Sequence, residues 1–199
     1  MAKLVMLSGG IDSTAALVKV LSDTDDDLFV HHIYLKNNMR RERPELVAVD
    51  NIVQYCKDKY RPFNFTMSYM DLSFMGNNVQ ADLYSVTYIT ALIVKQFPEI
   101  DCVVVSAIAE DELNPEMEER RRIARHIFES FFLDGGMPKI DMLLADMTKE
   151  QVINNLPKEL LELTWSCRKP AIDKDDNYIR CEKCHTCMSI ESALTSINN

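Results

Sequence analysis

The sequence lacks the long apolar runs, repeats and low-complexity segments that mark membrane, solenoid and disordered proteins. No apolar run approaches the ~18 residues of a membrane-spanning helix, so we expect no membrane partner. The opening MAKLVML is too short for a secretory signal, which predicts a cytoplasmic protein. Positive charge is also scarce, because 22 Lys and Arg stand against 31 Asp and Glu, giving a net charge of −9. This charge repels phosphate backbones and disfavours a nucleic-acid partner.

Apolar residues are sufficient for a core, at 47% hydrophobic and 8% aromatic. Short apolar runs alternate with amphipathic stretches, which predicts a doubly wound α/β fold with a parallel five-stranded sheet. The expected strands are 3–7, 28–35, 62–69, 101–107 and 140–144, and the expected helices are 13–21, 44–60, 79–97, 115–133 and 146–155. The third of these helices is apolar nearly all round, which predicts burial or a subunit contact, and we expect a homodimer.

The stretch MLSGGIDSTAAL, residues 6–17, gathers glycines, hydroxyls and a carboxylate between the first strand and the first helix. Ligands of doubly wound sheets bind at the carboxyl ends of strands. Glycines let backbone N–H groups approach an anion, and the following helix adds its free N–H groups and positive end. The stretch therefore predicts a phosphate-binding loop. It is neither a Walker loop nor a dinucleotide motif, because G-x-x-x-x-G-K-[ST] and G-x-G-x-x-G are both absent. The expected phosphate-binding residues are Leu7, Ser8, Gly9, Gly10, Ile11, Asp12, Ser13, Thr14 and, from a later helix start, Lys149.

Four of the six cysteines gather after about residue 164, where the composition changes. We therefore expect a nucleotide-binding domain over residues 1–163 and a metal-binding tail over residues 164–199. Cys181, Cys184 and Cys187 form C-x-x-C-x-x-C, and Cys167 lies 14 residues upstream. Four thiolates are typical of a structural Zn²⁺ site. His185 is a rival fourth ligand, which we rank lower because it adjoins Cys184, and an iron–sulfur cluster also uses four cysteines.

The string SGG-Ile11-DS resembles the PP-loop signature of adenine-nucleotide α-hydrolases, whose fold is Rossmann-like. Together with W-S-C…C-x-x-C-x-x-C and the looser segments at 38–46 and 145–152, it resembles the 7-cyano-7-deazaguanine synthase (QueC) family. The resemblance implies that ATP is cleaved between its α- and β-phosphates to adenylate 7-carboxy-7-deazaguanine. Ammonia then displaces AMP, and a second activation converts the amide to the nitrile. It also implies a ligase of queuosine biosynthesis in which Ser8, Asp12 and Ser13 are catalytic, with Asp12 near Mg²⁺ or the phosphates.

For the site that binds the acid, and for the group to which the activated acid is joined, the sequence leaves alternatives. Arg40, Arg41 and Arg43 follow the second strand and could clamp phosphates, although a solvated loop explains them equally well. Glu110 and Asp111 follow the fourth strand and could accept hydrogen bonds from a purine-like base, or could be solvated acids. Segments 82–85 and 109–114 depart from the family pattern. The activated acid could therefore be joined to a protein or another amine, or the substrate could be a tRNA base.

Overall fold

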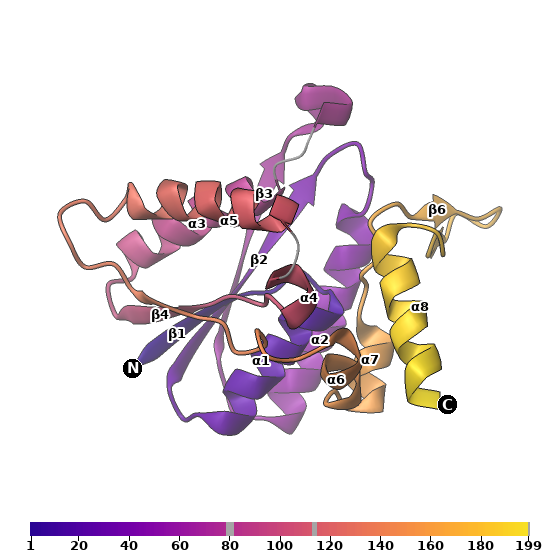
Figure 1. Ribbon diagram of the computed structural model, residues 1–199, viewed down its shortest axis with the longest axis horizontal. Helices are drawn as coiled ribbons and strands as arrows, with labels where there is room; N and C mark the ends of the chain where they lie inside the picture. The colour runs from indigo at the N-terminus through magenta and orange to yellow at the C-terminus, as the bar shows by residue number, and fades with distance from the viewer. Residues whose placement is uncertain (79–81, 113–114, 199) are drawn as a thin grey trace.

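The computed structural model describes residues 1–78, 82–112 and 115–198 and shows a five-stranded parallel sheet (Figure 1). The strand order is β3-β2-β1-β4-β5. All four pairings are parallel, as the alternation of strands and helices predicts. The strands are β1 Ala2–Met6, β2 Asp27–Lys36, β3 Asn64–Asp71, β4 Ile100–Val104 and β5 Lys139–Asp141.

Helices cover both faces of the sheet. One face carries α1 Ile11–Asp23, α2 Glu42–Lys59, α6 Lys149–Asn154, α7 Lys158–Leu163 and α8 His185–Asn198, which share one hydrophobic core. The other face carries α3 Asp82–Gln96 and α5 Pro115–Glu129 over a smaller core. The short elements are the 3-10 helix η1 Ser73–Asn78, α4 Ala109–Glu112 and the strands β6 Ala171–Ile172 and β7 Tyr178–Ile179.

The central strands are apolar at successive positions because both of their faces are buried. Val5 pairs with Val30 and faces the α1 and α2 side. Its neighbour Leu4 is fully buried against the α3 and α5 side. A parallel strand between two helix layers therefore favours apolar side chains at successive positions, as at Leu4 and Val5, and this run makes the first strand recognisable in the sequence.

Helix α3 is less buried than its apolar sequence suggests. Its buried residues are Thr90, Ala91 and Val94, whereas Tyr88 and Leu92 are 46% and 41% exposed. Residues 79–81, part of the predicted helix, lie outside the described residues. Packing within the chain therefore does not account for this apolar surface, and the homodimer stays a prediction.

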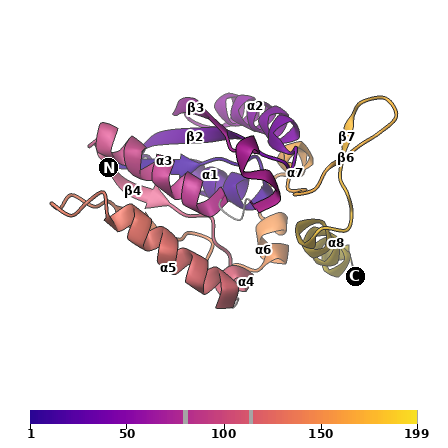
Figure 2. The ribbon, with the colours of Figure 1, turned by 90° about the horizontal axis from the view of Figure 1, so that it is seen from above.

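The tail stands at one side of the molecule, with α8 next to α6 (Figures 1 and 2). Helix α6 begins with the expected capping box, in which Thr148 and Gln151 each bond to the backbone of the other. The sequence did not predict α4, α7, α8 or the β6–β7 hairpin. Among the helices that the structure describes, none combines the length and apolarity needed to span a bilayer.

Candidate phosphate loop and four-cysteine site

The loop between β1 and α1 lies at the carboxyl edge of the sheet and packs tightly on α2. Gly9 has a φ of +83°, a conformation that side chains other than glycine rarely adopt. A Cβ at this position would lie 3.0 Å from the backbone oxygen of Glu45. Gly10 is the residue that precedes α1, which begins at Ile11, two residues before the expected start. Gly9 thus lets the loop backbone pack against α2, and Gly10 leads the chain into α1.

Hydroxyl groups brace this loop from within. The Oγ atoms of Ser8 and Ser13 lie 2.9 Å apart, and the N–H of Ser8 donates to Ser13 Oγ at 3.1 Å. Thr14 Oγ1 donates to the Gly10 carbonyl at 2.8 Å. Ser13 and Thr14 are buried, whereas Ser8 is exposed. Ser13 and Thr14 therefore hold the shape of the loop, and Ser8 is the hydroxyl that can reach a ligand.

A buried lysine meets the carboxylate of the loop. Lys149 Nζ lies 2.5 Å from Asp12 Oδ1, and Lys149 is only 8% exposed. Burial raises the pKa of Asp12, the ion pair with Lys149 acts in the opposite direction, and the charges of Asp111 and Glu110 raise it further. The starts of α1 and α6 thus converge here, and Lys149 lies where the sequence placed it, beside the loop.

The acids after β4 hold the neighbouring backbone. Glu110 Oε1 accepts the N–H of Lys149 at 2.8 Å, and the carboxylate of Asp111 accepts the N–H of Ile108 at 3.4 Å. Arg121 donates to the Asp111 carbonyl at 2.9 Å. Both acids therefore lie at the strand ends near the loop, each with one carboxylate bond to the backbone, and their role towards a base stays a prediction.

The basic segment after β2 is partly neutralised by acids. Arg41 pairs with Glu45 at 3.4 Å and also with Asp82 at the start of α3. Arg40 and Arg43 are exposed, and Arg40 has a positive φ of 55°. Burial raises the pKa of Glu45 to about 7, although Arg41 acts to lower it. Arg41 is thus engaged by two carboxylates, and a phosphate would have to compete with them.

The four cysteines of the tail converge on one point. The Sγ atoms of Cys167, Cys181, Cys184 and Cys187 all lie within 4.8 Å of one another. Zn–S bonds of ~2.3 Å in a tetrahedron place sulfurs roughly 3.8 Å apart, so this donor set fits one metal ion. The N–H of Cys184 already points to Cys181 Sγ at 3.3 Å. His185 is exposed at the start of α8, and the described group consists of cysteines alone.

The segment before Cys167 joins the metal group to the phosphate loop, a contact that sequence reasoning missed. The N–H of Trp165 donates to the Gly9 carbonyl at 2.8 Å. Ser166 Oγ accepts the N–H of Ile11 at 3.1 Å. The one available signal was the position of the Trp-Ser pair directly before a metal-binding cysteine.

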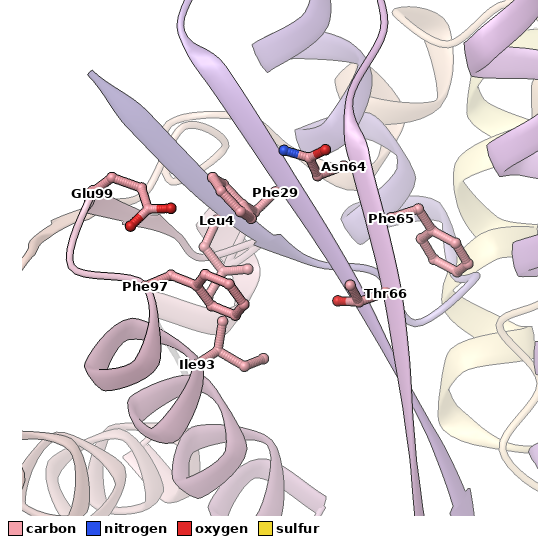
Figure 3. A pocket seen from close by; sticks show the side chains of 8 residues that line it. All are labelled: Leu4, Phe29, Asn64, Phe65, Thr66, Ile93, Phe97 and Glu99. Carbon is pink, nitrogen blue, oxygen red and sulfur yellow. The ribbon is translucent and has the colours of Figure 1, made fainter.

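An apolar groove of about 390 Å³ lies away from this region (Figure 3). Its lining includes Leu4, Phe29, Ile93 and Phe97, with Asn64 and Glu99 at its edge. Leu4 pairs with Phe29, and Phe29 with Asn64, at the beginning of β3. The groove therefore sits towards the amino ends of the strands, on the α3 side, and is not the phosphate site.

Comparison with known proteins supports the fold. No protein-family model matches the chain, and no curated protein matches it. Among solved structures, it is similar to the U34-tRNA thiolase NcsA from Methanococcus maripaludis with its [4Fe-4S] cluster, with a TM-score of 0.55 and 14% identity. The similarity covers 100% of this chain but only 65% of that protein. At this identity the likeness shows the fold alone, and it agrees with the predicted doubly wound α/β architecture.

Proposed function

We propose that this protein is an ATP-dependent adenylating enzyme that converts 7-carboxy-7-deazaguanine and ammonia to 7-cyano-7-deazaguanine. The loop Ser8–Ser13 carries the proposal, because it combines a tight glycine backbone, a helix start and hydroxyl groups at the carboxyl edge of the sheet. Lys149 and Asp12 add a buried charge pair. A Walker lysine is absent from the loop, which favours release of pyrophosphate over transfer of a γ-phosphate.

The proposed chemistry uses the loop as a pyrophosphate cradle. A carboxylate oxygen of the acid bonds to the α-phosphorus, and the bond from that phosphorus to the bridging oxygen breaks. Pyrophosphate leaves with the electron pair and is held by loop N–H groups, Ser8 and Lys149. Asp12 binds the Mg²⁺ that enters with ATP, which requires it to part from Lys149. Ammonia then adds to the carbonyl carbon of the adenylate, AMP leaves with the bonding electron pair and a proton is lost to solvent, which gives the amide. A second ATP adenylates the amide oxygen and releases a second pyrophosphate. The second AMP then leaves with that oxygen while the amide nitrogen loses its protons to solvent, which forms the nitrile.

We propose that the four cysteines hold one structural Zn²⁺. Their sulfurs lie within 4.8 Å of one another, which suits a single ion. In a [4Fe-4S] cluster each thiolate binds a different iron, so the sulfurs surround a larger group. A closed four-sulfur site leaves the zinc no open position for substrate, so its contribution is to hold the tail of residues 164–199 on the domain of residues 1–163.

A second candidate function is modification of a tRNA base with an adenylated intermediate. The observation in its favour is the structural likeness to a U34-tRNA thiolase that carries a [4Fe-4S] cluster. The net charge of −9 and the close spacing of the four sulfurs weigh against it. We therefore rank it second.

Product analysis separates these functions. The protein is incubated with MgATP, 7-carboxy-7-deazaguanine and ammonium ions, and nucleotides and purines are followed by mass spectrometry. We expect AMP, pyrophosphate and the nitrile. Ser8→Ala and Asp12→Ala should each lower the rate on the order of a hundredfold. Ser13→Ala removes hydrogen bonds that shape the loop and should lower the rate as well. Ser130→Ala, an exposed serine beyond α5, is the matched control. ADP and phosphate as products would refute adenylation, and AMP formed only with tRNA and a sulfur donor would favour the second candidate.

The acid is proposed to bind across the strand ends beside the loop, near Arg40, Arg41, Glu110 and Asp111. Asp111 is the sharpest test, because its carboxylate would accept from the base. Loss of a hydrogen bond to a charged group costs ~1.5–3 kcal/mol, so Asp111→Asn should weaken binding of the acid on the order of ten- to a hundredfold. Calorimetry should show unchanged affinity for ATP. Equal affinity of variant and parent for the acid would remove Asp111 from the site.

A further inference from the structure

The segment Thr164–Cys167, which we name the strap, runs from the end of α7 past the phosphate loop into the four-cysteine site. Its two middle residues bond to the loop on both sides of Gly10. Trp165 donates its N–H to the Gly9 carbonyl at 2.8 Å, and Ser166 Oγ accepts the N–H of Ile11 at 3.1 Å. The next residue, Cys167, is a member of the metal group and is buried. One peptide bond thus separates a loop contact from a metal ligand.

The loop is shaped to receive the strap. A Cβ at Gly10 would lie 3.3 Å from Ser166 Oγ, a tight contact, and 3.7 Å from the Trp165 carbonyl, an ordinary one, so the strap lies close against the loop backbone at this point. The N–H of Ile11 is the first of α1, one of the donors that a helix leaves without an internal partner. Because Ser166 accepts this bond, its own hydroxyl hydrogen remains to be donated, and the neighbouring N–H groups of the helix start are the donors that the proposed phosphate loop would offer to an anion.

The far end of the strap is also anchored. Arg180 donates to the Thr164 carbonyl at 2.8 Å, and the Trp165 ring N–H donates to the Cys167 carbonyl at 3.2 Å. The N–H of Cys181 lies 3.3 Å from Cys167 Sγ. The strap is therefore held by the loop at its middle residues and by the cysteine group at Cys167, and Arg180 holds its first residue, Thr164.

We propose that Ser166 is a positioning residue that couples metal occupancy of the four cysteines to the anion affinity of the phosphate loop. With metal bound, Cys167 is fixed and Ser166 Oγ is held on Ile11. Without metal, the strap loses that constraint and the loop loses a brace at the start of α1. The proposal rests on the proposed function only in that the loop binds pyrophosphate.

Coupling of this kind is reciprocal, so it can be measured from the metal side without any turnover. The zinc affinity of the full chain is determined by competition with a chromogenic chelator, with and without saturating inorganic pyrophosphate. We expect pyrophosphate to raise the zinc affinity about five- to tenfold in the parent, the low end of typical coupling. Ser166→Ala should still bind one zinc but show less than a twofold effect, and Ser166→Thr, which keeps the hydroxyl, should restore the coupling.

Two controls keep the outcomes distinct. Ser192→Ala, an exposed serine of α8, should couple as the parent does. Pyrophosphate binding is first measured by calorimetry on the zinc-loaded protein. No binding there would overturn both the proposed function and the coupling. Binding with equal zinc affinity in both conditions, or coupling retained by Ser166→Ala, would overturn the coupling alone. Failure to bind zinc through the four cysteines would also overturn it.

Discussion

The phosphate loop and the cysteine tail lie in contact, yet they are stabilised differently. The loop rests on a core in which Leu7, Ile11 and Val49 are at most 3% exposed. In the described part of the tail, the buried residues are Thr164, Cys167, Cys184 and Ala193. The loop therefore draws its order from hydrophobic burial around it, whereas the described part of the tail leaves most of its apolar residues exposed or only partly buried.

The β6–β7 hairpin of the tail is also too short to be stable by itself. Each of its strands has two residues, and a two-stranded hairpin is marginal in water even when longer. The metal proposed for the four thiolates would supply the missing folding energy, as in small metal-binding domains. We therefore expect one region of the molecule to be held by its core and the other to depend on the metal.

Removing the metal should have the largest effect, because it should unfold the tail and leave the loop and its core folded. Metal binding to structural thiolate sites is worth ~10–16 kcal/mol in small domains, so chelation or Cys184→Ala should unfold the tail. Hydrogen exchange should show lost protection in α8 and the hairpin, with β1, β2 and β4 still protected. Cys102→Ala, a cysteine of β4 outside the metal group, is the matched control and should leave α8 protected. Simultaneous loss of protection in the central strands would show that the two regions are not separately stabilised.

The same contrast explains what the sequence could predict. The strands and the loop are encoded locally, because β1 buries every side chain but one and Ser8–Ser13 is continuous in the chain. The tail contacts join residues far apart, such as Ile11 and Ser166, 155 positions away, and no local pattern reveals them. Helix α8 was missed because the metal-binding spacing C-x-x-C-x-x-C, whose last cysteine lies in the first turn of the helix, drew the interpretation away from the apolar residues Ile190 and Ala193 that follow. Lys149 was expected near the loop because it opens a helix at a strand end, but only the structure shows that it pairs with Asp12.

The two glycines of the loop should differ although they are adjacent. Gly9→Ala places a side chain at φ +83°, which costs roughly 1–2 kcal/mol, and sets its Cβ 3.0 Å from a backbone oxygen that cannot rotate away. We expect a loss of more than about 3 kcal/mol in the free energy of unfolding. Gly10→Ala meets the side-chain oxygens of Ser166 and Ser8 at 3.3 and 3.4 Å, which can shift. Its expected cost is about 1 kcal/mol or less. Urea denaturation compares them, and equal losses would contradict the packing argument.

Glu45 tests the electrostatics at the edge of the loop. Burial raises its pKa to about 7 from an ordinary value of 4.5. Between these pH values the folded protein keeps a proton that the unfolded chain has released, so the free energy of unfolding falls as pH rises, by roughly 3 kcal/mol in all. Glu45→Gln should remove this slope, as measured by urea denaturation from pH 4.5 to 8. Glu162→Gln, an exposed residue of α7, is the control. A slope unchanged by Glu45→Gln would contradict this assignment.

The smallest expected effect concerns His32, which supports the loop from β2. Strand β1 ends at Met6, and the N–H of the next residue, Leu7, still donates to the His31 carbonyl at 2.8 Å. The Leu7 carbonyl is instead 2.8 Å from His32 Nδ1. Burial lowers the pKa of His32, so its ring is neutral at pH 7 and Nδ1 carries the hydrogen that Leu7 accepts. The imidazole thus supplies the hydrogen bond to the Leu7 carbonyl where the backbone pairing of the strand ends and the loop begins.

His32→Asn and His32→Leu separate this hydrogen bond from the packing of the ring. The amide nitrogen of asparagine can take the place of Nδ1, whereas leucine offers no donor and leaves the Leu7 carbonyl without that bond. A hydrogen bond of ~1 kcal/mol predicts an affinity for pyrophosphate about fivefold weaker in His32→Leu and within twofold of the parent in His32→Asn. Both variants remove the ring, so both should lower the free energy of unfolding, and this shared loss controls for packing. Equal pyrophosphate affinities in the two variants, measured by calorimetry, would show that the core around Leu7 alone sets the shape of the loop.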